Sequence, residues 1–126
     1  MLSSNFKKSV GAAGENAAAV YLVKKGYKIL ERNYLGRRFE IDIIAADQNG
    51  EIHFVEVKTR KNEKFGKGIE FVTPAKLNAI KRGALSYMSM LGKDLNMHFD
   101  VIEIYGAFGV FGFKVDKINM YKDVVG

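Results

Sequence analysis

Cysteine is absent from the 126 residues of the chain, and so is any long apolar run. The lack of cysteine excludes disulfide bonds and thiolate metal sites. The longest apolar run, residues 17–23, has seven residues, whereas a helix that spans a bilayer needs about 20. The first residues contain lysine without an apolar segment after it, which does not predict a secretory signal. We therefore expect a cytoplasmic protein that does not enter the membrane.

The overall charge of the chain is positive. Lys and Arg number 20 against 14 Asp and Glu, which gives a net charge of +6 and a pI near 9.5. Clustered positive charge favours a polyanionic partner such as nucleic acid. Many small proteins are basic without such a partner, so charge alone leaves both interpretations open. The length and the hydrophobic content of 48% predict a single domain over residues 1–126.

Periodicity and end signals predict two helices and five strands. The first helix covers residues 8–25 and stops at Gly26, because glycine commonly follows the last turn of a helix. The second helix begins at Thr73-Pro74, an N-cap followed by proline at the first helical position, and ends at Gly92. Strands are expected over 27–33, 39–44, 51–59, 97–105 and 110–115, and a Lys- and Gly-rich loop over 60–70. The order α-β-β-β-α-β-β predicts an α/β fold, a mixed sheet with helices packed on it.

The most informative segment is a predicted hairpin over residues 39–59. Apolar and acidic residues alternate with period two in its first strand, and Asn49-Gly50 is a strong turn signal. If the connection holds three residues, 48–50, then Asp42 lies opposite Glu56. A slip of one residue would move charged side chains to the apolar face, so the hydrophobic pattern favours this register. The apolar face is then expected to contain Phe39, Ile41, Ile43, Ala45, Val55 and Val57.

Charged side chains gather on the other face of this hairpin. Asp42 and Glu56, on opposed strand positions, would repel each other unless a cation lies between them. Mg²⁺ prefers such carboxylate ligands, and Lys58, two residues along from Glu56, could orient or deprotonate an attacking water. The alternative is a solvated strand face in which Glu40 pairs with Lys58. The spacing of these residues leaves both interpretations open.

Glu15 is a further acidic candidate, on the first predicted helix. Its neighbours on the same helix face are small or apolar, as expected of a face that packs closely on a sheet. A carboxylate buried there is costly unless it is paired or bound to a metal. Alanines occur all round this helix, so an exposed alanine face is the alternative.

Three segments taken together resemble the YraN family of bacterial proteins. They are Gly14-Glu15 followed by Ala18 and Leu22, then Phe39-Glu40-Ile41-Asp42-Ile43-Ile44-Ala45, then Phe54-Val55-Glu56-Val57-Lys58-Thr59-Arg60. The resemblance covers about residues 11–105 and implies the PD-(D/E)XK, restriction-endonuclease-like group, which is similar to archaeal Holliday-junction resolvases. The chain departs from the family pattern at Phe39, where glycine is usual, and at His98, where arginine is common.

The resemblance implies roles for the acidic residues and for one lysine. Asp42, Glu56 and Glu15 would be metal ligands for Mg²⁺ or Mn²⁺, and Lys58 would be the motif lysine of the catalytic set. Basic residues that could contact nucleic-acid phosphates are Arg60, Lys76, Lys81 and Arg82. A solvated polar face explains these basic residues equally well.

The histidines and the late aromatic residues have structural interpretations. His53 and His98 do not have the sequence spacing of metal ligands, so we expect each to be a satisfied or a surface histidine. Phe108, Phe111 and Phe113 alternate with glycines, and we expect them to pack in the core or in a homodimer rather than to stack on bases.

These observations favour a metal-dependent endonuclease that hydrolyses phosphodiester bonds in DNA, with branched DNA as one candidate substrate. The first alternative is a non-catalytic nucleic-acid-binding module that keeps the nuclease fold. The second is an interaction domain whose acidic cluster is an exposed strand face. Cleavage separates the enzyme from both alternatives, and salt-dependent DNA binding separates the alternatives from each other. The sequence leaves open whether DNA or RNA is cut and whether the protein dimerises.

Overall fold

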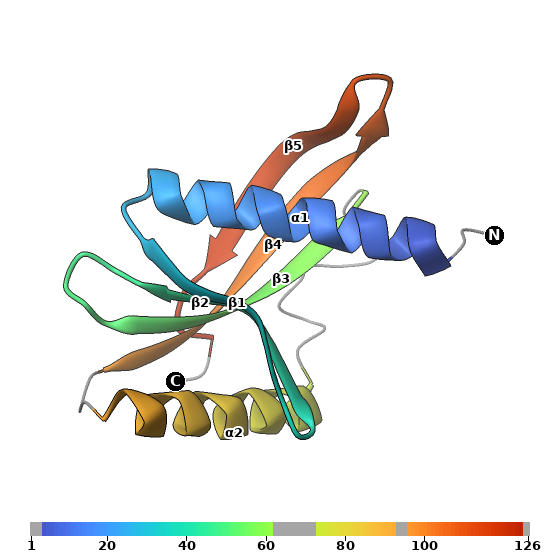
Figure 1. Ribbon diagram of the computed structural model, residues 1–126. Helices are drawn as coiled ribbons and strands as arrows, with labels where there is room; N and C mark the ends of the chain where they lie inside the picture. The colour runs from blue at the N-terminus through green and yellow to red at the C-terminus, as the bar shows by residue number, and fades with distance from the viewer. Residues whose placement is uncertain (1–3, 62–72, 93–95, 125–126) are drawn as a thin grey trace.

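The computed structural model describes residues 4–61, 73–92 and 96–124 (Figure 1). Its elements are α1 (Ser4–Lys24), β1 (Lys28–Gly36), β2 (Phe39–Ala46), β3 (Ile52–Arg60), α2 (Pro74–Leu91), β4 (Met97–Gly109) and β5 (Gly112–Tyr121). The order is the predicted α-β-β-β-α-β-β. The loop predicted over 60–70 lies outside the described residues from 62 onward, and Arg60 is the last residue of β3.

A five-stranded mixed sheet, in the order β1-β2-β3-β4-β5, forms the middle layer of the molecule. All neighbouring strands are antiparallel except β3 and β4, which are parallel. A parallel pair needs a crossover connection, and α2 lies in the segment that joins β3 to β4. Helix α1 covers one face of the sheet and α2 lies against the other (Figure 1). The predicted mixed α/β fold is therefore confirmed.

The predicted register of the central hairpin is confirmed. Ile43 pairs with Val55 and Ala46 with Ile52, and this register places Asp42 opposite Glu56 at the next position. The turn is closed by Asp47, whose carboxylate accepts hydrogen bonds from the backbone N–H groups of Asn49 and Glu51. Local turn chemistry and the alternation of apolar residues therefore determine which residues meet across this hairpin.

The predicted apolar face of the hairpin is wrong in one respect. Ile43 packs in the cluster under α1, but Ile41 packs in the cluster under α2, together with Ile44. The ring of Phe39, predicted on the face of Ile43, likewise lies beside Gly83 of α2. Strict alternation would place Ile41 and Ile43 on the same face. Strands β1 and β2 bend together toward α2 (Figure 1), and β1 carries a bulge between Ile29 and Glu31, which increases the local twist. Both faces of the sheet are covered by helices, so a change of face still leaves Ile41 buried.

Each helix approaches the sheet through a glycine. A Cβ on Gly14 of α1 would lie 1.8 Å from Oγ1 of Thr59, and a Cβ on Gly83 of α2 would lie 2.6 Å from the ring of Phe39. Neither position has room for a side chain. Helix α2 begins and ends as predicted, with the Thr73 hydroxyl accepting from the N–H of Lys76 and with Gly92 at a φ of 64°.

The last hairpin is longer than predicted. The strand expected over 97–105 continues to Gly109, and the strand expected over 110–115 begins at Gly112 and continues to Tyr121. Phe111 lies in the turn and is fully exposed, whereas Phe113 packs on the core cluster under α1. The expected core packing is thus confirmed for Phe113 only. Neither helix has the length and the hydrophobicity that crossing a bilayer requires.

Candidate metal centre

Three carboxylates from three different elements lie near one another: Glu15 of α1, Asp42 of β2 and Glu56 of β3. Glu56 is 6% exposed. Oδ2 of Asp42 accepts a hydrogen bond of 2.8 Å from the backbone N–H of Val57. Oε1 of Glu15 is buried and has no hydrogen-bond partner among the residues that the structure describes. The arrangement therefore gathers acidic groups without giving each of them a protein donor.

The pKa values of two of these carboxylates, Asp42 and Glu15, are raised by their surroundings. Burial, and then the neighbouring carboxylate of Glu56, raise the pKa of Asp42 to about 7, although the N–H of Val57 opposes the shift. Burial likewise raises the pKa of Glu15, and the carboxylates of Glu40 and Glu56 add to the effect against the opposing charge of Arg32. Burial and like charges both disfavour the ionised form of an acid. A cation at this position would relieve both effects.

Two lysines lie beside the carboxylates. Nζ of Lys58 lies 3.5 Å from Oε1 of Glu56, and Nζ of Lys76 forms an ion pair with the same oxygen. Burial lowers the pKa of Lys58, and the nearby ammonium of Lys76 lowers it further. Burial also disfavours the charge on Lys76, but Glu56 outweighs this and raises its pKa. We call Glu15, Asp42, Glu56, Lys58 and Lys76 the carboxylate cluster.

The solvated strand face does not describe these residues. That alternative required a Glu40–Lys58 pair, but within the described ranges Lys58 forms its ion pair with Glu56 and no pair joins it to Glu40. Glu56 is buried rather than solvated. Asp42, Glu56 and Lys76 nevertheless line a cleft of ≈ 440 Å³ between the β1–β2 hairpin and α2. The acidic groups are thus both desolvated and reachable from solvent.

The structure therefore brings together Glu15, Asp42, Glu56 and Lys58, the residues predicted for catalysis and metal binding. Lys76, predicted as a phosphate contact, lies in the carboxylate cluster, where it pairs with Glu56. The capping signal at Thr73 places Lys76 in the first turn of α2 but does not say where α2 docks, so no sequence signal could have shown this pair. Lys81 and Arg82 are exposed farther along α2, and Arg60 is partly buried at the end of β3.

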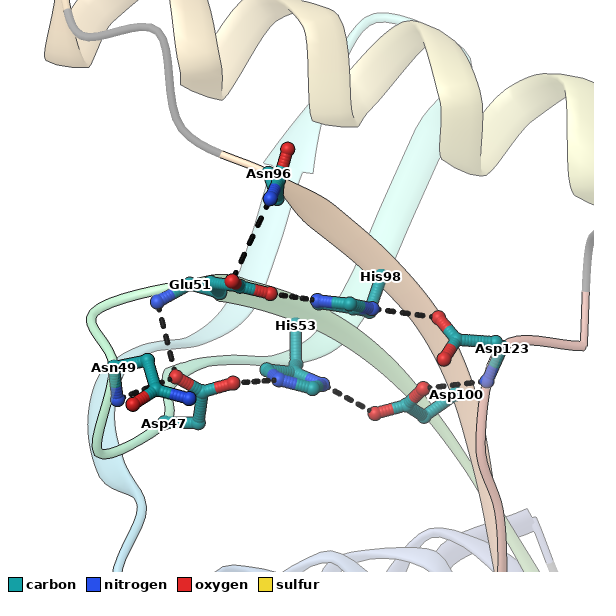
Figure 2. A network of polar contacts seen from close by, with 8 residues as sticks. All are labelled: Asp47, Asn49, Glu51, His53, Asn96, His98, Asp100 and Asp123. Atoms are coloured by element: carbon teal, nitrogen blue, oxygen red, sulfur yellow. Dashed lines mark hydrogen bonds and ion pairs between the residues drawn. The ribbon is translucent and has the colours of Figure 1, made fainter.

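A second cluster surrounds the two histidines (Figure 2). His53 of β3 and His98 of β4 are direct partners in the parallel register, and their rings are stacked with centroids 4.4 Å apart. Sequence spacing could not reveal this, because the pairing follows from the crossover through α2. The residues of this histidine cluster are Asp47, Glu51, His53, His98, Asp100 and Asp123.

Each imidazole lies between two carboxylates. Nε2 of His53 lies 2.8 Å from Asp47 Oδ2, and its Nδ1 lies 2.6 Å from Asp100 Oδ2. His98 is arranged in the same way, with Nε2 2.6 Å from Glu51 Oε1 and Nδ1 2.6 Å from Asp123 Oδ1. Burial disfavours the charged rings, but the flanking carboxylates outweigh it and raise the pKa of both. The predicted satisfied histidines are confirmed; their mutual contact is a feature that the sequence analysis missed.

Comparison with known proteins places the chain in a family. The model of the uncharacterised protein family UPF0102, the YraN family, matches residues 14–104. A UPF0102 protein of Bacteroides thetaiotaomicron is 42% identical over 110 residues, which is 87% of this chain and 88% of the relative. A UPF0102 protein of Thermodesulfovibrio yellowstonii is 48% identical over 95 residues, 75% of this chain and 84% of the relative. These names assign no activity. The chain belongs to the UPF0102 family.

Proposed function

We propose that the protein is a metal-dependent endonuclease that hydrolyses phosphodiester bonds in DNA, with the carboxylate cluster as its active site. The observation that carries this proposal is the pair Asp42 and Glu56. They are the next residues beyond the paired Ile43 and Val55 and line one cleft. Glu56 is buried and Asp42 is partly buried, and the pKa of Asp42 is raised to about 7. Two neighbouring carboxylates shielded from water destabilise a protein unless cations compensate them. Their presence here therefore favours a functional role for the pair.

The donor set fits a hard divalent cation. Asp42, Glu56 and Glu15 offer carboxylate oxygens, which Mg²⁺ and Mn²⁺ prefer, and Oε1 of Glu15 is buried without a partner among the described residues. The two lysines cannot balance three ionised carboxylates. When bound, the ion would supply a Lewis acid for a phosphate oxygen and would restore Asp42 to its ionised form.

The chain's own residues account for the remaining roles. Lys58, whose pKa is lowered by burial and by Lys76, is suited to orient an attacking water or to take its proton. Lys76 is half-exposed at the cleft and pairs with Glu56, so it can turn to a substrate phosphate once a cation replaces that pair. Lys81 and Arg82 on α2 and Arg60 on β3 are the proposed contacts to the DNA backbone.

The experiment that tests the proposal is a cleavage screen with linear, flapped and four-way DNA and with RNA, each with Mg²⁺ or Mn²⁺. We expect cleavage by the wild type and none by Glu56→Gln or Lys58→Ala. Lys114→Ala is the matched control, because it removes an exposed lysine of β5 that belongs neither to the carboxylate cluster nor to the proposed DNA contacts, and it should leave most of the activity. Metal-dependent cleavage that persists in both cluster variants would belong to a contaminant and would refute the proposal.

The competing function is a binding module without turnover. It shares two expectations with the enzyme: DNA binding that falls with salt, and affinity without metal that holds or rises in Glu56→Gln because a negative charge near the phosphate is lost. It differs in predicting no cleavage with either ion. The screen and a binding titration on the same samples therefore separate the two functions.

A further inference from the structure

We propose that the histidine cluster is a second metal site, for a transition metal of the Zn²⁺ class, held by His53, His98, Asp47 and Glu51. The possible ligand atoms of Asp47, His53 and His98 all lie within 4.8 Å of one another. The site is separate from the carboxylate cluster and does not rest on the proposed nuclease activity.

The contacts of the ring nitrogens lead to this inference. All four ring nitrogens lie 2.6 to 2.8 Å from a carboxylate oxygen. A neutral imidazole donates through one nitrogen, so the lone pair of the other nitrogen would face an acceptor. That contact is favourable only when a cation lies between the two atoms, either a proton or a metal ion. The Nε2 atoms of both rings lie on the same side of the stack, so one divalent ion can replace two protons (Figure 2).

The Nδ1 side of each ring has the support that metal-bound histidines usually have. Nδ1 of His53 lies 2.6 Å from Asp100, whose side chain is fully buried and also accepts from the backbone N–H of Asp123. Nδ1 of His98 lies 2.6 Å from the carboxylate of Asp123. A carboxylate on the far nitrogen fixes the tautomer and raises the basicity of the coordinating nitrogen. Both rings are thus prepared to donate the Nε2 lone pair.

A shared ion requires one of the rings to tilt. The two ring planes differ by only 17°, and the Nε2 lone pair of each histidine lies in the plane of its own ring. The two lone pairs therefore cannot point at one ion about 2.0–2.1 Å away unless the angle between the rings increases. His98 is able to move, since its side chain is 23% exposed and that of its partner Asp123 is 58% exposed. His53, with a side chain 6% exposed, would stay in place.

The donors select the class of metal. Two imidazole nitrogens with carboxylate oxygens suit Zn²⁺, Co²⁺ or Ni²⁺, whereas Mg²⁺ prefers oxygen ligands alone. Four carboxylates surround the two rings, so the cluster stays negative even when both imidazoles are protonated. Asp47, Glu51, His53 and His98 also line a cavity of ≈ 680 Å³, which gives an ion a path from solvent.

Titration of the full chain with Co²⁺, followed by visible absorption and by thermal unfolding, tests the site. An Asp42→Asn background weakens the carboxylate cluster as a competing ligand set. We expect absorption bands of nitrogen-ligated Co²⁺ that saturate at one equivalent, are displaced by Zn²⁺ and accompany a rise in the unfolding temperature.

The variant that tests the ligands without removing positive charge is His98→Arg. An arginine can donate to both Glu51 and Asp123, which keeps the pairing of charges, but it does not coordinate a metal. We expect Co²⁺ affinity to fall more than about tenfold in His98→Arg and in His53→Gln. Circular dichroism checks folding; if the buried His53→Gln does not fold, the partly exposed His98→Arg decides.

Either of two results would overturn the proposal. The first is the absence of Co²⁺ bands in the Asp42→Asn protein, which would mean that the imidazoles hold protons only. The second is binding of unchanged affinity in His98→Arg, which would place the ion elsewhere.

Discussion

The carboxylate cluster and the histidine cluster both draw residues from β3, but they balance their charges differently. In the histidine cluster every ring nitrogen has a carboxylate partner within 2.8 Å. In the carboxylate cluster, Lys58 and Lys76 share one oxygen of Glu56, whereas Oε1 of Glu15 has no partner within the described ranges. A cluster in which a buried carboxylate oxygen lacks a donor is poised for a cation. A cluster in which every ring nitrogen has a carboxylate partner is stable until a metal displaces the protons between them.

Removing an acid from the carboxylate cluster should have the largest effect. Asp42→Asn keeps the shape of the side chain but loses a charged metal ligand, so we expect cleavage with Mg²⁺ to fall about 1,000-fold or more. Single-turnover assays measure it. If the two clusters are independent sites, His98→Arg should cleave DNA at a rate close to that of the wild type. Equal losses in the two variants would show that the clusters act as one site.

A larger side chain at Gly14 should disturb the packing of α1 on the sheet beside the carboxylate cluster. Gly14→Ala places a Cβ 1.8 Å from Oγ1 of Thr59, which forces α1 away from β3 beside Glu15. We expect the free energy of unfolding to fall by about 2 kcal/mol or more in urea denaturation.

Gly11→Ala provides the matched control for this variant. Nothing lies within 4 Å of a Cβ at Gly11, so this change should be neutral or should stabilise the helix by up to about 1 kcal/mol. Adding Thr59→Ala to Gly14→Ala removes the clashing hydroxyl and should recover part of the loss. A Gly14→Ala protein as stable as the wild type would contradict the close approach.

The raised pKa of Asp42 also predicts that the stability of the protein depends on pH. The pKa of Asp42 is raised from 3.8 to about 7 in the folded state. Between pH 4 and pH 7, roughly, the folded protein therefore keeps a proton on Asp42 that the unfolded chain has released. The free energy of unfolding should therefore fall as the pH rises through this range in metal-free buffer. Asp42→Asn should remove part of this dependence and be about 1–2 kcal/mol more stable than wild type at pH 8. An Asn variant less stable than wild type at pH 8 would show that Asp42 is already compensated.

The smallest expected effect concerns the basic residues of α2. If about five basic residues contact phosphates, the slope of log K against log salt on duplex DNA should be about −4 to −5. Lys81→Ala and Arg82→Ala should each reduce that slope by about 1, as fluorescence anisotropy at several salt concentrations would show. His98→Arg should leave the slope nearly unchanged. A slope near zero in the wild type would leave the charge of +6 without a role in DNA binding.

Much of the architecture followed from the sequence by itself. The Asn49-Gly50 turn and the period-two alternation determined the hairpin register, and with it the meeting of Asp42 and Glu56. Thr73 and Gly92 determined the ends of α2. These signals act over a few residues, through turn geometry, capping and the burial of one face, so a single chain segment contains them.

Other features were decided only by the tertiary structure. The stacking of His53 on His98 depends on a parallel register whose partners are joined through α2, and no local pattern sets that register. The bend that moves Ile41 under α2 requires a second helix to cover that face. The ion pair of Lys76 with Glu56 depends on where α2 docks. Each of these contacts joins segments far apart in the chain, and only the packing of the whole sheet between its two helices brings them together.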